Sequence, residues 1–347
     1  MRTGLWKFCE FACWNIIIAA LFPFTSGLEQ TMETHYTTKK DYGISLIRML
    51  SMFMIITCHV LQYYDNVFFR LFNVGVQVFL IISGYLYGIR KIESVPTFLF
   101  KQVKKIIVPY WTFLIVAVAL YWILSPDYIS PVIVRDSFLT IGTIRGLGHL
   151  WFIKYILVCY CLLPLLNAIR DRMNSGISMF VAGVFAMILV HLFFTRFDVL
   201  EGDIINCFVL GYFLSNIEKR FDNSSFGYLS FSVIVFALVM NLVKFDMLCK
   251  DLSAFDWNGG FSKYSHLLLG AAIFLLLYKY ATIEKNKILD MSDKYSYTIY
   301  VVHQIFIWSP LSVMSLSGIQ TIDIALVYIL SCIGGYLLYL LSNNISR

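Results

Sequence analysis

The run ISLIRMLSMFMIITCH, at residues 44–59, is apolar along almost its whole length and carries only one arginine and one histidine. With its flanks it covers residues 43–63, which matches the roughly 20 apolar residues that a membrane-spanning helix requires. Comparable stretches recur along the chain, so the sequence predicts an all-α, polytopic integral membrane protein with about ten transmembrane helices. We expect the others at 70–89, 106–124, 149–169, 177–195, 203–217, 225–243, 264–281, 296–315 and 321–342.

The composition agrees with lipid as the main solvent. Hydrophobic residues make up 59% of the 347, and charged residues only 14%, compared with roughly 25% in soluble proteins. The net charge of +6 is spread along the chain without a basic stripe, so we expect the bilayer as a partner and no nucleic acid. The cysteines lie mostly inside apolar runs and the histidines lack ligand-type spacing, so we also expect no metal.

The chain is interpreted as one membrane domain over residues 32–347, preceded by a hydrophobic segment at 1–31. That segment fits a signal sequence, an extra helix or translation from an upstream start. We expect Met32 to be the native start, which N-terminal sequencing of the natural protein would test. Lysine and arginine concentrate on one side if the residues before the first span are cytoplasmic and the spans alternate. Both ends of the ten-helix unit are therefore predicted to be cytoplasmic.

The first span carries two ionisable side chains, Arg48 and His59. Eleven positions at 100° each bring them to the same helix face, about 16.5 Å apart along the axis. An arginine suits phosphate or a polarised carbonyl, and a histidine suits general-base chemistry. Arg48 could instead extend to the membrane interface and His59 could bond a neighbouring helix. Because both share one face, we favour a functional pair.

A basic cluster follows the second span, with Lys101, Lys104 and Lys105 at helical spacing. Such a cluster on the cytoplasmic side is typical of a topology anchor against anionic lipid. A binding site for cofactor phosphates is the alternative. From these residues alone the anchor is favoured.

Two further clusters contain histidine. His149 and Trp151 lie with a glycine turn at the predicted outer end of the fourth span, and His303 lies inside the ninth. An aromatic ring beside polar groups suits sugar binding, although an interfacial aromatic belt explains the tryptophan equally well.

Taken in order, these features resemble the membrane acyltransferase family 3, which acylates sugars of bacterial surface glycans. The spacing of Arg48 and His59 is the hallmark of that family, and GVQVFLIISGYL at 75–86 is similar to its next motif. The lysines before Pro109-Tyr110-Trp111, the HLWF stretch at 149–152 and YVVH at 300–303 match later signatures. The chain departs in having Ser45 where an aspartate is common, lysines in place of arginines, and no acidic pair after HLWF.

The resemblance implies transfer of an acyl group, most often acetyl, from cytosolic acyl-CoA to a hydroxyl of a cell-surface or lipid-linked glycan. It implies His59 as base or acyl acceptor and Arg48 as the residue that positions the donor. The three lysines would bind CoA phosphates, and His149, Trp151 and His303 would lie on the acceptor side. The location would be the bacterial inner membrane. The sugar, the hydroxyl and the oligomeric state are left open by the sequence.

Other functions stay open at this point. A membrane acyltransferase acting on lipids or proteins would use similar donor chemistry. A transporter or flippase for a glycan or lipid-linked sugar would often have internal repeats and helices broken near mid-membrane. The prolines lie mainly at span ends or in loops, which argues weakly against that architecture. A purely structural role is disfavoured by the pairing of Arg48 with His59.

Overall fold

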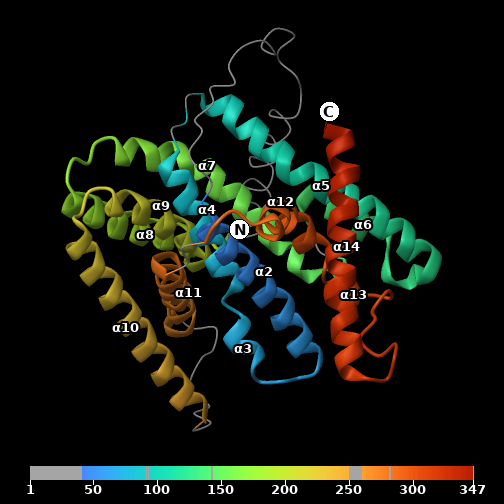
Figure 1. Cartoon of the computed structure of the whole chain (residues 1–347). Helices are drawn as coiled ribbons and strands as arrows, with labels where there is room; N and C mark the ends of the chain where they lie inside the picture. The colour runs from blue at the N-terminus through green and yellow to red at the C-terminus, as the bar shows by residue number, and fades with distance from the viewer. Residues whose placement is uncertain are drawn as a thin grey trace.

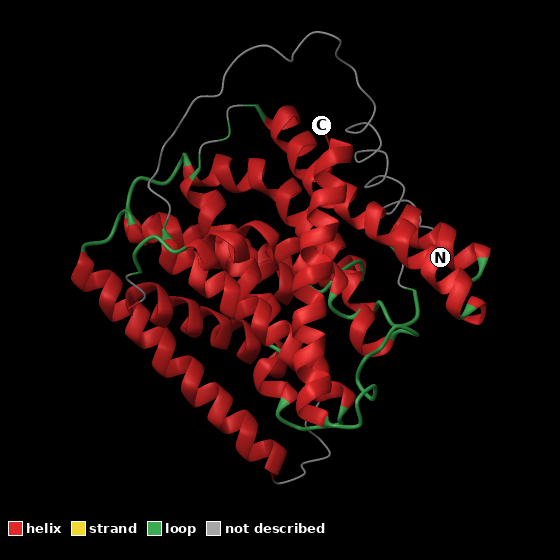
Figure 2. Cartoon of the chain, turned by 45° about the vertical axis from the view of Figure 1, so that its right-hand side comes forward, coloured by secondary structure: helices red, strands yellow, loops and turns green. Residues whose placement is uncertain are grey.

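The computed structural model describes residues 41–90, 92, 94–141, 144–249, 260–280 and 283–346, and the regular elements within them are all helical (Figure 2). The predicted leader at 1–31 and the start at Met32 lie outside the described residues. The longer helices are α2 (Tyr42–Tyr63), α4 (Gly75–Ile89), α5 (Val95–Leu124), α6 (Pro131–Thr140), α7 (Phe152–Arg170), α8 (Gly176–Phe197), α9 (Gly202–Glu218), α10 (Asn223–Cys249), α11 (Gly260–Tyr280), α12 (Lys287–Val302) and α14 (Gln320–Ser346). The short elements are α3 (Phe69–Phe72), η1 (Pro126–Tyr128), η2 (Gly148–Trp151) and α13 (Ile305–Trp308).

Within the described part of the chain, 8 helical segments are long and apolar enough to cross a membrane. This confirms the all-helical, polytopic class, while the predicted count of about ten is not reached. The segment at 203–217 forms α9, which is only 17 residues long and buried along nearly its whole length. The segment at 296–315 is not one helix, because α12 ends at Val302 and only the short α13 follows.

Burial separates the inner helices from the peripheral ones. Half or more of the residues in the apolar windows of α2 and α4 are buried, whereas α8, α10 and α14 are mostly exposed. Figure 1 shows α10 on the left of the molecule and α14 on the right, with α2 between them. Large apolar side chains on the peripheral helices, such as Phe185 and Leu242, point away from the protein. Such a surface is typical of helices that face lipid.

Helices α4 and α9 pack backbone to backbone through small residues. A Cβ added at Gly84 would lie 2.0 Å from the carbonyl oxygen of Phe208, and one added at Gly211 would lie 2.1 Å from that of Ile81. Neither helix can therefore carry a larger residue there without separating from the other. Small residues permit this approach in membrane proteins, and they explain the Ser83-Gly84 pair of the second motif as a packing feature.

The break between α12 and α13 is explained by two histidine side chains that bind backbone carbonyls at the end of α12. In an uninterrupted helix the carbonyls of Tyr300 and Val301 would accept hydrogen bonds from the amides four residues later. Here the imidazole of His303 binds the Tyr300 oxygen at 2.6 Å, and that of His149 binds the Val301 oxygen at 3.0 Å. The prediction of a continuous helix over 296–315 was wrong because helical periodicity does not reveal such competing side chains.

The helix ends gather at two opposite ends of α2. The start of α2 lines a cavity together with the end of α9, the start of α10 and the end of α11. The end of α2 lines a second cavity with η1, the segment before η2, and α13. These groups agree with the predicted alternation of the spans. The assignment of the first group to the cytoplasm stays a prediction from the distribution of lysine and arginine.

Candidate active site

Three histidines from distant parts of the sequence meet in the interior. The ring centroid of His303 lies 5.3 Å from that of His59 and 4.6 Å from that of His149, and His59 and His149 are 6.5 Å apart. His149 and His303 are fully buried, whereas His59 is partly exposed. The structure thus brings together the three histidines that the sequence analysis selected.

The hydrogen bonds of the three rings differ, and the difference separates their chemical roles. His149 has both ring nitrogens against oxygen atoms, Nε2 at 3.0 Å from the Val301 carbonyl and Nδ1 at 2.6 Å from Oε1 of Gln304. Its backbone amide also donates to Gln304, and the hydroxyl of Tyr300 donates to its carbonyl. His149 is therefore held from several sides and has no ring nitrogen left for a substrate.

His59 and His303 each keep one nitrogen without a partner. Nδ1 of His59 donates to Oε1 of Gln62 at 2.8 Å, and Nε2 makes no hydrogen bond within the described residues. Nδ1 of His303 donates to the Tyr300 carbonyl, while its Nε2 is buried with no partner there. Because a carbonyl oxygen only accepts, the neutral rings carry their proton on Nδ1 and have a lone pair on Nε2. Of the two, only His59 is partly exposed and can meet a substrate directly.

A cavity of about 490 Å³ lies beside this cluster, at the end of α2 that is predicted to face outwards. Its lining includes Gln62 and Gln304, the residues that hold His59 and His149. The cavity is therefore separated from His59 and His149 only by the two glutamines that bind them. The remaining lining residues are Tyr128, Arg145, Gly146, Gly148 and Trp308.

Arg48 lies on the same face of α2, towards the other end. It forms an ion pair with Asp293 of α12, and His59 contacts the residue that directly follows α12. This common neighbour confirms that the two side chains share a helix face. Met52 and Ile55, between them, are buried.

Arg48 belongs to a group of cations. It is within electrostatic range of Arg90, and Lys105 is within range of both. The Arg90 guanidinium stacks on the ring of Tyr87 at 5.4 Å. Asp293 neutralises part of this charge at Arg48, and the remaining like charges would be stabilised by a further anion. Lys101 lies one helical turn before Lys105; both side chains are exposed, and that of Lys104 is partly buried.

Comparison with known families decides the class of the protein. A family model described as an acyltransferase domain, that of acyltransferase family 3, matches residues 41–340. The chain belongs to acyltransferase family 3. Comparisons with curated proteins and with solved structures gave no match. Membership supports an acyltransferase activity and a multi-pass membrane protein, in agreement with the resemblance found in the sequence.

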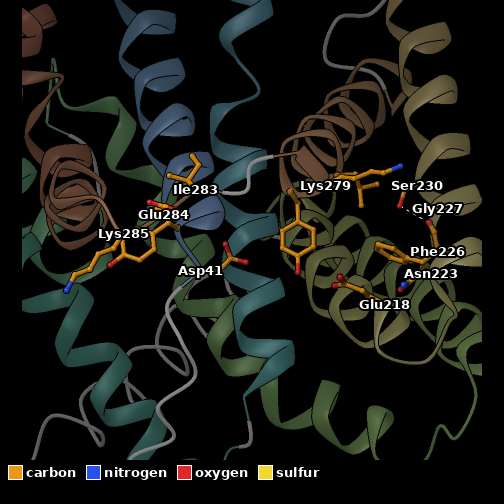
Figure 3. Close-up of a pocket in the computed structure, with 13 residues that line it drawn as sticks. Asp41, Glu218, Asn223, Phe226, Gly227, Ser230, Lys279, Ile283, Glu284 and Lys285 are labelled. Carbon is orange, nitrogen blue, oxygen red and sulfur yellow. Dashed lines mark hydrogen bonds between the residues drawn. The ribbon is translucent and has the colours of Figure 1, made fainter.

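In this member of acyltransferase family 3, a second and larger cavity lies at the end opposite the histidines. It measures about 1280 Å³, and three carboxylates and two lysines line it. Figure 3 shows the carboxylates of Asp41 and Glu218 among its labelled residues. Glu218 accepts a hydrogen bond from Tyr85, whose hydroxyl also lies 2.7 Å from that of Tyr278. Carboxylates outnumber lysines among the lining residues of this cavity, whereas cations outnumber the carboxylate of Asp293 in the group around Arg48.

Several residues at the site were not selected from the sequence. Gln62 and Gln304 could have been found, since one lies a helical turn after His59 and the other directly follows His303. Arg90 and Asp293 approach Arg48, and Arg145 joins the outer cavity, only through folding, so no local sequence pattern marks them. Trp151 packs against Tyr155, with centroids 5.0 Å apart, and is not among the lining residues of the outer cavity, where Trp308 lies instead.

Groups of histidine, cysteine, aspartate and glutamate with metal-site geometry are absent from the part of the chain that the structure describes. In the histidine cluster the nitrogens of His149 are already bound to oxygen atoms. The absence of a metal cofactor stays a prediction from the sequence.

Proposed function

We propose that the protein transfers an acyl group, with acetyl as the first candidate, from cytosolic acyl-CoA to a hydroxyl of a cell-surface or lipid-linked glycan. The observation that carries the proposal is the arrangement along one face of α2. Arg48 lies in a cationic group towards one end, and His59 has an unpaired nitrogen beside a cavity at the other. We place the protein in the bacterial inner membrane, with the Arg48 end cytoplasmic.

The donor side would use the cations. Arg48, Arg90 and Lys105 supply a compact set of positive charges for the phosphates of CoA. Guanidinium groups bind phosphate with two parallel hydrogen bonds, and a lysine adds a point charge. The pantetheine chain of CoA is long and thin, so it suits the path along α2 towards His59. Lys101 and Lys104 would add weaker attraction nearer the surface.

The acceptor side would use His59 as the general base. Nε2 of His59 removes the proton of the glycan hydroxyl while its oxygen attacks the thioester carbonyl. The new C–O bond forms, the C–S bond breaks, and the proton passes to the departing thiolate of CoA. Gln62 fixes the tautomer that leaves Nε2 free. Transient acylation of His59, followed by transfer to the hydroxyl, is the alternative order.

The test is transfer of radiolabelled acetyl from acetyl-CoA to surface glycan in membranes that contain wild type or the His59→Ala variant. General-base catalysis contributes about 10²–10⁴-fold, so we expect alkali-labile label to fall by at least 100-fold in a well-expressed variant. His191→Ala is the matched control. His191 is also within an apolar helix, α8, but its ring packs against Tyr264 and not against the three clustered histidines. Equal labelling by wild type and His59→Ala would remove His59 from the mechanism.

The transporter alternative is not favoured by the family. A helix broken near mid-membrane is found in transporters, and α12 and α13 form such a break. Here the break is accounted for by the imidazoles that bind the Tyr300 and Val301 carbonyls. Absence of label from acetyl-CoA and from other acyl-CoA donors, with glycan export lost on deletion, would restore the transporter.

A further inference from the structure

The outer cavity has a single charged side chain among its described lining residues, and that side chain is Arg145. Arg145 is exposed, and its guanidinium stacks on the ring of Tyr128 at 4.8 Å. It makes no ion pair within the described residues. Two other cations predicted on the same side are paired, Arg135 with Asp136 and Lys263 with Glu201.

The stacking leaves the hydrogen-bonding edge of the guanidinium available. A ring face below a guanidinium holds its plane without using the N–H groups, which point outwards in that plane. Those N–H groups match the geometry of a carboxylate or a phosphate, to which arginine binds with two parallel hydrogen bonds. The described lining residues of the cavity include no carboxylate that would compete for them.

The backbone around Arg145 is fixed by a close approach to α13. Gly146 has φ +82°, a conformation that L side chains rarely adopt, and a Cβ there would lie 2.7 Å from the carbonyl oxygen of Trp308. The hydroxyl of Tyr121 also donates to the Arg145 carbonyl at 3.4 Å. The position of Arg145 relative to Trp308 is therefore set by the fold and does not depend on a bound ligand.

The same cavity has a surface on which a sugar ring can stack. Trp308 is 42% exposed, and its ring packs edge-on against Tyr63 with centroids 5.2 Å apart. Gly148 also lines the cavity, and a Cβ added there would meet no atom within 4 Å. Packing thus does not require glycine at 148, and its missing side chain leaves space in the cavity.

We propose that this cavity binds an acceptor sugar that carries an anionic group, a carboxylate or a phosphate, with Arg145 as the specificity-determining residue. This inference rests on the proposed function, because it places the sugar hydroxyl near His59. Arg145 would bind the anion, Trp308 the face of the ring, and Gln62 and Gln304 neighbouring hydroxyls. A neutral sugar would leave the Arg145 guanidinium without its partner.

The test measures binding by the purified full-length protein in detergent, using calorimetry and no acyl donor. The probes are para-nitrophenyl β-D-glucuronide, the matching neutral glucoside, and that glucoside phosphorylated on its primary hydroxyl. We expect wild type to bind at least one anionic probe about tenfold more tightly than the neutral one. Which anionic probe binds distinguishes a carboxylate from a phosphate.

The variant Arg145→Gln should bind the anionic and neutral probes equally, whereas the control Arg135→Gln should keep the wild-type preference. Equal binding of all three probes by wild type, or an unchanged preference in Arg145→Gln, would overturn the inference. Because no acyl donor is present, the result is independent of catalysis. The loss of the preference can be measured even in a preparation that transfers no acetyl. Acetyl transfer to neutral glycan alone would overturn this inference but leave the proposed function intact.

Discussion

The lysines before Pro109 give the sharpest test of the donor site, because the structure separates residues that the sequence treats alike. Both Lys101 and Lys105 are exposed, but only Lys105 is placed within electrostatic range of Arg48 and Arg90. Lys105 would therefore bind a phosphate there directly, while Lys101, one turn earlier, would add only a screened attraction. A charge-assisted hydrogen bond contributes about 1.5–3 kcal/mol, and an exposed ion pair about 0–1 kcal/mol. We therefore expect Lys105→Gln to raise KM for acetyl-CoA by about 10–100-fold, and Lys101→Gln by about fivefold or less.

The assay is acetyl transfer by the protein in liposomes at several acetyl-CoA concentrations and at two ionic strengths. The turnover number should change little in either variant, because uniform binding energy affects KM and not kcat. Added salt should reduce the effect of both variants, since both lysines are exposed and exposed charges are screened. Acetyl-dephospho-CoA as donor shows whether Lys105 binds the ribose phosphate or the diphosphate. An effect of Lys101→Gln equal to or larger than that of Lys105→Gln would refute the placement of the phosphates beside Arg48.

Two further predictions concern packing and the histidine cluster. Gly84→Ala should lower the melting temperature of the purified protein markedly, because its Cβ would clash with the Phe208 carbonyl, and overpacking costs about 1–3 kcal/mol. Gly227→Ala is the control, with no atom within 4 Å of the added Cβ, and equal melting of the two variants would contradict the proposed α4–α9 contact. His303→Phe keeps a ring beside His59 but loses both nitrogens, so we expect kcat to fall about tenfold or more with KM for acetyl-CoA unchanged. A higher KM for acetyl-CoA with an unchanged kcat would argue against a role for His303 in positioning His59.

The parts of the site that the sequence could predict are those set by the geometry of a single helix. Arg48 and His59 share a face because helical periodicity is local, and their common neighbour α12 confirms it. The apolar runs likewise predicted the membrane class, because the requirement for about 20 apolar residues depends on the bilayer and not on the tertiary fold. The position of α9 was predicted too, although its burial by neighbouring helices was not.

What the sequence could not predict depends on contacts between distant segments. His149 and His303 are 154 positions apart in a chain with no local pattern to join them, yet Gln304 and the Val301 carbonyl hold His149 in place. The same contacts end α12, so the failure to predict a broken helix and the failure to predict the cluster have one cause. Arg90 and Arg145 were missed because each is an ordinary basic residue at a helix end or in a loop until the fold gives it neighbours.

The separation of Arg48 from His59 bears on how the proposed reaction can cross the membrane. Eleven residues of helix span about 16.5 Å, roughly half of the 30 Å thickness of the hydrocarbon core. Arg48 and its cationic neighbours therefore lie about half a bilayer from His59, so in the proposed reaction neither a charged nucleotide nor a sugar would need to traverse the whole core. Only the thin pantetheine chain and its acyl group would cover the distance between them. Met52 and Ile55 are buried between Arg48 and His59, so this face of α2 is apolar there and would suit a neutral thioester better than the phosphates. In the proposed reaction the charged part of the donor would therefore bind at one end of α2 and the acceptor hydroxyl at the other.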